Sequence, residues 1–222
     1  MGFPQVAATN TSSETANATT HTVNLPAGIA AGDLLLVVFG VDGAPAVTFP
    51  GGWTKVGLGA GTSTNLFFGH KIADGGEGAS ISVTTDASER SAHQSYRINH
   101  WHGVTVPVFG ALEANGTDTA ADPPSVNPST WGTENTLWII TVVSDADTTF
   151  SADPANYTNP LENDSGSTTA GVKVRTLRRE LAAASEDPDA FTNTNREWHA
   201  RTIGIRPAQL ASVRRRAFRG GP

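Results

Sequence analysis

The feature that most constrains this sequence is an internal repeat. Residues 22–54 and residues 125–158 both run from Val-Asn through a small-residue turn into an apolar segment, then through an Asp-bearing turn to a Thr-Phe pair. Both end in an aromatic residue followed by threonine, Trp53-Thr54 in the first and Tyr157-Thr158 in the second. Two such halves, joined by the proline-rich link 118–130, indicate duplication of one structural unit.

The repeated unit is rich in strand signals. Residues 33–41 (DLLLVVFGV) are apolar on both faces, which is typical of a central strand that is covered on each side. The chain also contains 23 glycines and 13 prolines, which favour many short strands separated by turns. We therefore predict an all-β fold, an antiparallel jelly-roll-like β-sandwich built from two similar halves of about six strands each.

The predicted β-sandwich unit spans residues 21–207, with pseudo-repeats 21–103 and 123–207. Two arrangements fit this division. In the first, one compact sandwich has sheets that draw on both halves. In the second, two small sandwiches follow one another. One compact unit is favoured because each half alone would bury a thin core.

The two ends of the chain differ from the unit between them. Residues 1–20 are small and polar, and we expect an N-terminal arm or a weakly packed edge segment. Residues 208–222 form a basic tail that carries four arginines and no acid, whereas the rest of the chain has a net charge of −10. Two alternatives are open for the tail: a solvated, frayed C-terminus, or an assembly contact with an acidic protein surface through Arg214, Arg215, Arg216 and Arg219.

Composition excludes several classes of function. The absence of cysteine excludes disulfides, thiol catalysis and Cys-ligated metals. The basic tail is too short for the broad positive footprint of a nucleic-acid binder. No apolar run approaches the ~18 residues of a membrane span, and the first twenty residues lack a secretory-signal pattern. We therefore expect no direct contact with nucleic acid or membrane.

Catalytic and metal signals are sparse. His100 and His102 could share one face of a predicted strand and hold a metal in a cupin-like barrel, but the nearest downstream acid, Glu113, is not at a telling spacing. Asp42, Asp145, Asp147 and Asp153 could bind calcium, although aspartate is also favoured in turns for its backbone hydrogen bonds. We expect a non-enzymatic protein with no cofactor and no bound metal.

Among the five tryptophans, Trp101 is the candidate contact residue. Trp138 lies inside an apolar segment and is expected in the core, while Trp53 and Trp131 are expected to cap the sandwich. On a strand, Trp101 would point away from the face that carries His100. The pattern therefore leaves two alternatives for Trp101: ordinary packing, or an exposed position from which it contacts a glycan or a partner protein.

Several short phrases resemble a group of bacteriophage and prophage virion structural proteins. In the first half these are LPAGIAAGDLLL, PGGWT and DGGEG, and in the second NTLWII, P-x-x-Y-T, AAASEDP-x-AF and T-I-x-I-R-P, so the resemblance covers about residues 20–207. It implies a β-sandwich protein of the head-decoration, fibre or tail type. It supplies no catalytic residues.

This resemblance sets the functional expectation. It implies a structural protein of a tailed phage particle, foremost a capsid decoration protein of the cement type. The alternative is a tail or fibre component that binds a carbohydrate receptor. Its partners would be major capsid or tail proteins and further copies of itself, such as a trimer. It would reside in the virion after assembly in the bacterial cytoplasm.

Overall fold

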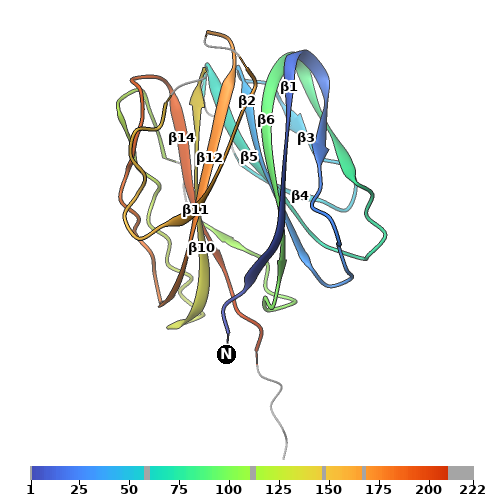
Figure 1. Ribbon diagram of the computed structural model, residues 1–222, viewed down its shortest axis with the longest axis vertical. Helices are drawn as coiled ribbons and strands as arrows, with labels where there is room; N and C mark the ends of the chain where they lie inside the picture. The colour runs from blue at the N-terminus through green and yellow to red at the C-terminus, as the bar shows by residue number, and fades with distance from the viewer. Residues whose placement is uncertain (1, 58–60, 111–113, 147–148, 167–168, 210–222) are drawn as a thin grey trace, which may run out of the picture.

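The computed structural model describes residues 2–57, 61–110, 114–146, 149–166 and 169–209, and every regular element within them is a β-strand. Two six-stranded antiparallel sheets pack face to face (Figure 1). This arrangement confirms the predicted all-β sandwich of two similar halves.

The first half of the chain forms the whole of the first sheet. Its strands lie in the order β1-β6-β2-β5-β4, and β3 pairs with β6 beside this path. The strands are β1 (Gln5–Asn24), β2 (Leu34–Asp42), β3 (Val47–Thr48), β4 (Thr54–Val56), β5 (Thr64–Ile72) and β6 (Ser80–Asn99).

The second half forms the second sheet, in the order β11-β12-β10-β14-β7, with β8 also paired to β14. A small third sheet joins β9 to β13. The strands are β7 (Val108–Phe109), β8 (Ala114–Gly116), β9 (Ala120–Ala121), β10 (Glu134–Asp145), β11 (Thr158–Asp164), β12 (Val172–Ala183), β13 (Phe191–Thr192) and β14 (Trp198–Ile205).

The two sheets share one connectivity. Strands β2 and β10 occupy equivalent central places, flanked by β5 and β6 in the first sheet and by β12 and β14 in the second. The edge strands β4 and β11 begin at Thr54 and Thr158, the residues that close the sequence repeat. Each sheet draws on one half only, so the sheets do not mix the halves, and the halves are not two separate sandwiches. They are the two layers of one unit.

The central core lies between the two sheets. Alternate residues of a strand face opposite sides, so Leu34, Leu36 and Val38 of β2 face the second sheet, and Leu137 and Ile139 of β10 face the first. The side chains of all five residues are buried. The other faces of β2 and β10 are buried as well, as expected for strands that are apolar throughout.

The outward faces are covered by chain from the same half. Val37 and Phe39 of β2 pack beneath Val23 and Val83, which lie late in β1 and early in β6. On the second sheet, the outward cluster includes Trp138 of β10 and residues of β9 and β13, whose hydrophobic members are Ala121 and Phe191. The molecule is therefore a two-sheet sandwich with an additional cover on each outer side.

The cover of the first sheet is made by β1 and β6 themselves. The pairing of β1 with β6 shifts register between Glu14 and Ala18 and again before Thr20, and β-bulges of this kind bend a strand pair. Figure 1 shows the blue ribbon of β1 rising from the N-terminus and turning over at the top of the sandwich. Asn10 Nδ2 then donates a hydrogen bond to the Leu25 carbonyl across the fold, at 2.9 Å.

The polar arm expected over residues 1–20 is therefore not separate from the sandwich. Residues 5–20 belong to β1 and pair along β6. Their side chains are small and polar because β1 lies at a sheet edge, where backbone hydrogen bonds rather than side-chain burial hold the strand.

A buried histidine pair lies where the ribbon turns over. Ser91 Oγ is 2.6 Å from His21 Nδ1 and 2.7 Å from His93 Nε2. The His93 ring stacks on Phe39 at a centroid distance of 4.8 Å, and its Nδ1 is 3.0 Å from Ser12 Oγ. Burial, with a smaller contribution from His21, lowers the pKa of His93 to about 3. This imidazole is therefore neutral in the folded protein.

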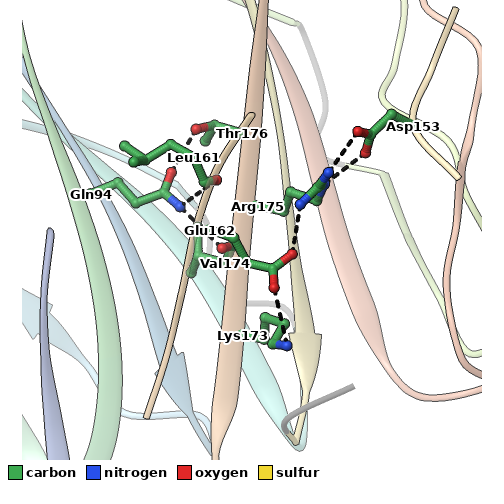
Figure 2. A network of polar contacts seen from close by, with 8 residues as sticks. All are labelled: Gln94, Asp153, Leu161, Glu162, Lys173, Val174, Arg175 and Thr176. Carbon is green, nitrogen blue, oxygen red and sulfur yellow. Dashed lines mark hydrogen bonds and ion pairs between the residues drawn. The ribbon is translucent and has the colours of Figure 1, made fainter. Parts of the chain in front are cut away.

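Buried polar side chains also join the two sheets (Figure 2). Gln94 Nε2 donates hydrogen bonds to the carbonyls of Leu161 and Val174, at 2.9 and 3.0 Å, and Gln94 Oε1 accepts one from Thr176 Oγ1 at 2.6 Å. The Tyr96 hydroxyl completes the chain by bonding to Thr176. Burial raises the pKa of Tyr96 to about 12. Each polar group is satisfied only in one register of the sheets, so the network fixes that register.

Gly40 of β2 marks a close approach of the sheets. A Cβ atom there would lie 2.4 Å from Val174 Cγ2 and 2.9 Å from Val143 Cγ2. We expect Gly40→Ala to lower the free energy of unfolding by about 1–3 kcal/mol, because the sheets must separate. Chemical denaturation measures this change. Gly51→Ala is the control, since nothing lies within 4 Å of its Cβ, and an equal loss in both variants would contradict the explanation.

The histidine pair predicts an acid-sensitive fold. The unfolded chain protonates His93 near its ordinary pKa of 6.5, whereas the folded protein holds it neutral down to about 3. The unfolded state therefore binds more protons between these values, and the free energy of unfolding should fall as the pH decreases from about 6.5 toward 3. Denaturation at a series of pH values measures the slope. His93→Gln should flatten it, and an unchanged slope would contradict the prediction.

Candidate functional site

Several functional candidates gather at one end of the sandwich. Strand β1 begins there, where Gln5 pairs with Asn99, and β14 ends there, where Ile205 pairs with Leu137. The N-terminus and the last described residues lie together at the bottom of Figure 1. We call this surface the terminal end and define it by residues 2–5, 100–107 and 206–209.

The segment that leads into the basic tail is firmly held at the terminal end. The Arg206 guanidinium donates two hydrogen bonds to the Glu134 carboxylate, at 2.8 and 2.7 Å, and its Cζ lies 5.8 Å from the centre of the Trp131 ring. The bonds from Arg206 lower the pKa of Glu134. Backbone bonds from His102 to Arg206 and from Ala208 to His100, each 2.9 Å, complete the attachment. The direction in which the chain leaves the sandwich is therefore set.

Beside this segment, a loop presents apolar side chains to solvent. Val104 is 77% exposed and Val106 is 46% exposed. The Thr105 amide donates a hydrogen bond to His102 Nδ1 at 3.0 Å, which restrains the loop at its centre. These two valines are the large apolar side chains that the loop exposes at the terminal end.

Trp101 does not have the exposure expected of a contact residue. It is only 5% exposed and belongs to the core between the sheets, and its Nε1 donates a hydrogen bond to the Gly32 carbonyl at 2.8 Å. The prediction failed because β6 ends at Asn99, so the strand alternation that would have exposed Trp101 does not reach it. By contrast, Trp138 is fully buried as predicted.

The same early end of β6 changes the histidine candidates. His100 has a φ of 54°, a turn conformation, so His100 and His102 do not share a strand face. Asp42 and Asp145 end β2 and β10, and burial raises the pKa of both, with a further rise for Asp42 from the Asp145 charge. Over the described ranges, no three His, Asp or Glu side chains are grouped closely enough to hold a metal ion.

The proposed tail contacts lie outside the described residues. These are Arg214, Arg215, Arg216 and Arg219, all beyond Gln209, the last residue that the structure describes. Their assembly role stays a prediction.

A cavity of about 150 Å³ lies at the opposite end, between the halves. Its most strongly held side chain is Glu197, just before β14, which accepts hydrogen bonds from the amide and hydroxyl of Thr62, both at 2.7 Å, and from the amides of Ser63 and Thr64. Burial alone would raise the pKa of Glu197, but these donors outweigh it and lower the pKa to about 2. The other described lining residues are Gly61, Asn115, Gly116, Thr117 and His199.

Glu197 therefore links the two sheets by hydrogen bonds and is not suited to transfer a proton. We call this link between Glu197 and residues 62–64 the clasp. A carboxylate that titrates near pH 2 stays ionised at neutral pH and is a poor general acid or base. Its oxygens are already engaged by the loop that leads into β5. No sequence pattern indicated this role, because Thr62 and Glu197 are 135 residues apart.

No helix in the described part of the chain is long and apolar enough to cross a membrane. Comparisons with protein-family models, with curated proteins and with solved structures gave no match.

The clasp can be tested by Glu197→Gln, which removes the charge and one acceptor. We expect the free energy of unfolding at neutral pH to fall by about 1–3 kcal/mol, because the donors of Thr62, Ser63 and Thr64 lose a charged partner. The pKa of Glu197 is lowered, so its contribution is complete above about pH 4.5 and is lost as the pH falls through about 2. Urea denaturation measures both effects. Asp189→Asn, at an exposed position, is the control, and equal losses would count against the clasp.

Proposed function

We propose that the protein is a non-enzymatic structural component of a tailed bacteriophage particle, and that it serves as a capsid decoration protein of the cement type. The carrying observation is the terminal end, where the exposed Val104 and Val106 adjoin the fixed segment that leads into the basic tail. The resemblance of residues 20–207 to virion structural proteins supports the same proposal.

A cement protein must bind between neighbouring subunits without changing its own fold. The sandwich meets this need, because its sheets are fixed to each other by a shared core and by the polar network around Gln94. An apolar loop beside the segment that leads into a cationic tail supports binding of a neighbour by burial and by charge together. Partners would be the major capsid protein and further copies of this chain in a closed oligomer such as a trimer.

The alternative, a tail or fibre component that binds carbohydrate, loses the residue on which it depended. Sugar stacking needs an exposed aromatic face, and Trp101 is buried. Among the described residues, the large apolar side chains that are exposed are all aliphatic: Ile72, Val104 and Val106. Aliphatic side chains fit a protein interface better than a sugar ring.

The proposal predicts that the terminal end controls assembly. Replacing Val104 and Val106 by Asp together, or deleting residues 210–222, should reduce self-association and the occupancy of purified phage particles. The melting temperature should stay within a few degrees, since these valines are exposed. Light scattering after size-exclusion chromatography measures the oligomer, and gel densitometry of particles measures the occupancy.

Ala87→Asp is the control, because it introduces the same acidic side chain at an exposed position where the β1–β6 ribbon bends. It should assemble like the parent. Unchanged oligomer size and unchanged occupancy in both test variants would overturn the proposal.

A further inference from the structure

A second cavity, of about 200 Å³, lies between the sheets at the terminal end. It is smaller than the pockets that hold drug-sized ligands, so its occupant must be small. Its lining comes from four strands of both sheets, β1, β10, β11 and β12. The lining residues are Gln5, Val6, Leu137, Asn159, Arg178 and Glu180.

The inward face of β12 changes from apolar to charged along its length, and the cavity lies beside the charged part. Alternate residues share this face. Val172 and Val174 belong to the central core, Thr176 joins the Gln94 network, and Arg178 and Glu180 follow on the same side. The register confirms this placement, because Arg178 lies opposite Ile139 and Glu180 opposite Leu137, both core residues of β10.

A β-bulge in the neighbouring strand places an amide at the cavity wall. Thr158 pairs with Arg178, but the next partners are Leu161 and Thr176, so β11 carries an extra residue at this point. Asn159 within the bulge has a φ of 53°. The bulge directs the side chain of Asn159 to the cavity instead of leaving it in the regular alternation of the strand.

Elsewhere on β12 the charged side chains are paired. Figure 2 shows Arg175 with two bonds to Asp153, both 2.6 Å, and one to Glu162, 2.7 Å. Arg179 is 2.8 Å from the carboxylate of Glu186. These pairs involve residues of the outward row, opposite to the row that holds Arg178.

Arg178 and Glu180, on the inward row, differ from these paired residues. Throughout the described ranges, no carboxylate lies within ion-pair distance of Arg178, and no cationic side chain lies within that distance of Glu180. Arg178 is half-buried, and Glu180 is exposed at the mouth of the cavity. Arg178 and Glu180 are two residues apart on one face, so their Cα atoms lie about 7 Å from each other along the strand. A guanidinium and a carboxylate that are carried side by side in this way can take opposite charges of one ligand.

We propose that this cavity binds a small zwitterion of the α-amino acid class. The Arg178 guanidinium takes the ligand carboxylate through paired N–H donors, and the Glu180 carboxylate takes its ammonium group. The amides of Gln5 and Asn159 hydrogen-bond the remaining polar atoms, while Val6 and Leu137 contact an aliphatic side chain. Glu180 repels simple polyanions such as sulfate, which have no cationic group to offer it.

Titration calorimetry on the full chain tests the site with glycine, L-alanine and L-valine as probes, and with acetate and ethylammonium as ligands that carry only one of the two charges. We expect the amino acids to bind and the single-charge ligands to bind at least tenfold more weakly. Arg178→Gln and Glu180→Gln should each weaken amino-acid binding about tenfold or more, since each removes a charged hydrogen bond.

Arg196→Gln and Asp189→Asn are the controls, because they change the same charges at exposed positions outside the cavity. Both should bind the probes as the parent does. Melting temperatures of all variants without ligand establish that they are folded. Acetate binding as tight as that of glycine, with no effect of Glu180→Gln, would overturn the proposal, and so would the absence of binding at about 10 mM of every amino acid tested.

Discussion

The burial of both faces of β2 and β10 is the constraint on which the rest of the structure depends. A strand that is apolar on every side cannot lie at the surface of a sandwich unless a second layer covers it. The inward faces cover each other across the central core. Each half must then supply a cover for its own outward face, and the bent β1–β6 ribbon and the small β9–β13 sheet provide these covers. The two similar halves therefore have the same need for an outer cover. Each half supplies this cover with different elements.

Buried polar groups fix the position of one sheet relative to the other. Apolar side chains alone would tolerate small shifts between sheets, whereas a buried amide without a partner costs free energy. Gln94 finds its partners on β11 and β12 of the opposite sheet, and Glu197 finds its donors on the loop before β5. Beyond Thr176, the inward row of β12 carries Arg178 and Glu180, which line the cavity at the terminal end.

Sequence patterns predicted those features that depend on neighbouring residues. The repeat, the central strand over residues 33–41 and the burial of Trp138 were predicted correctly, because alternation and apolar runs are local. The expected exposure of Trp101 was wrong because β6 ends at Asn99, two residues before Trp101. The polar residues 5–20 gave no hydrophobic signal, yet they form a strand, because backbone groups pair whatever the side chains are. Arg178 and Glu180 drew no attention, since charges on a strand usually face solvent.

The sequence by itself determined an all-β chain made of two similar halves. The apolar runs, the turn residues and the internal repeat can all be recognised in the sequence without knowing which residues are in contact. Only the tertiary structure decided that each half becomes one layer, that β1 turns back over its own sheet and that Glu197 holds Thr62 across the molecule. The physical reason is that these outcomes depend on contacts between residues far apart in the chain. Such contacts are selected by the burial and hydrogen-bond satisfaction of the whole assembly, and no short window of sequence contains them.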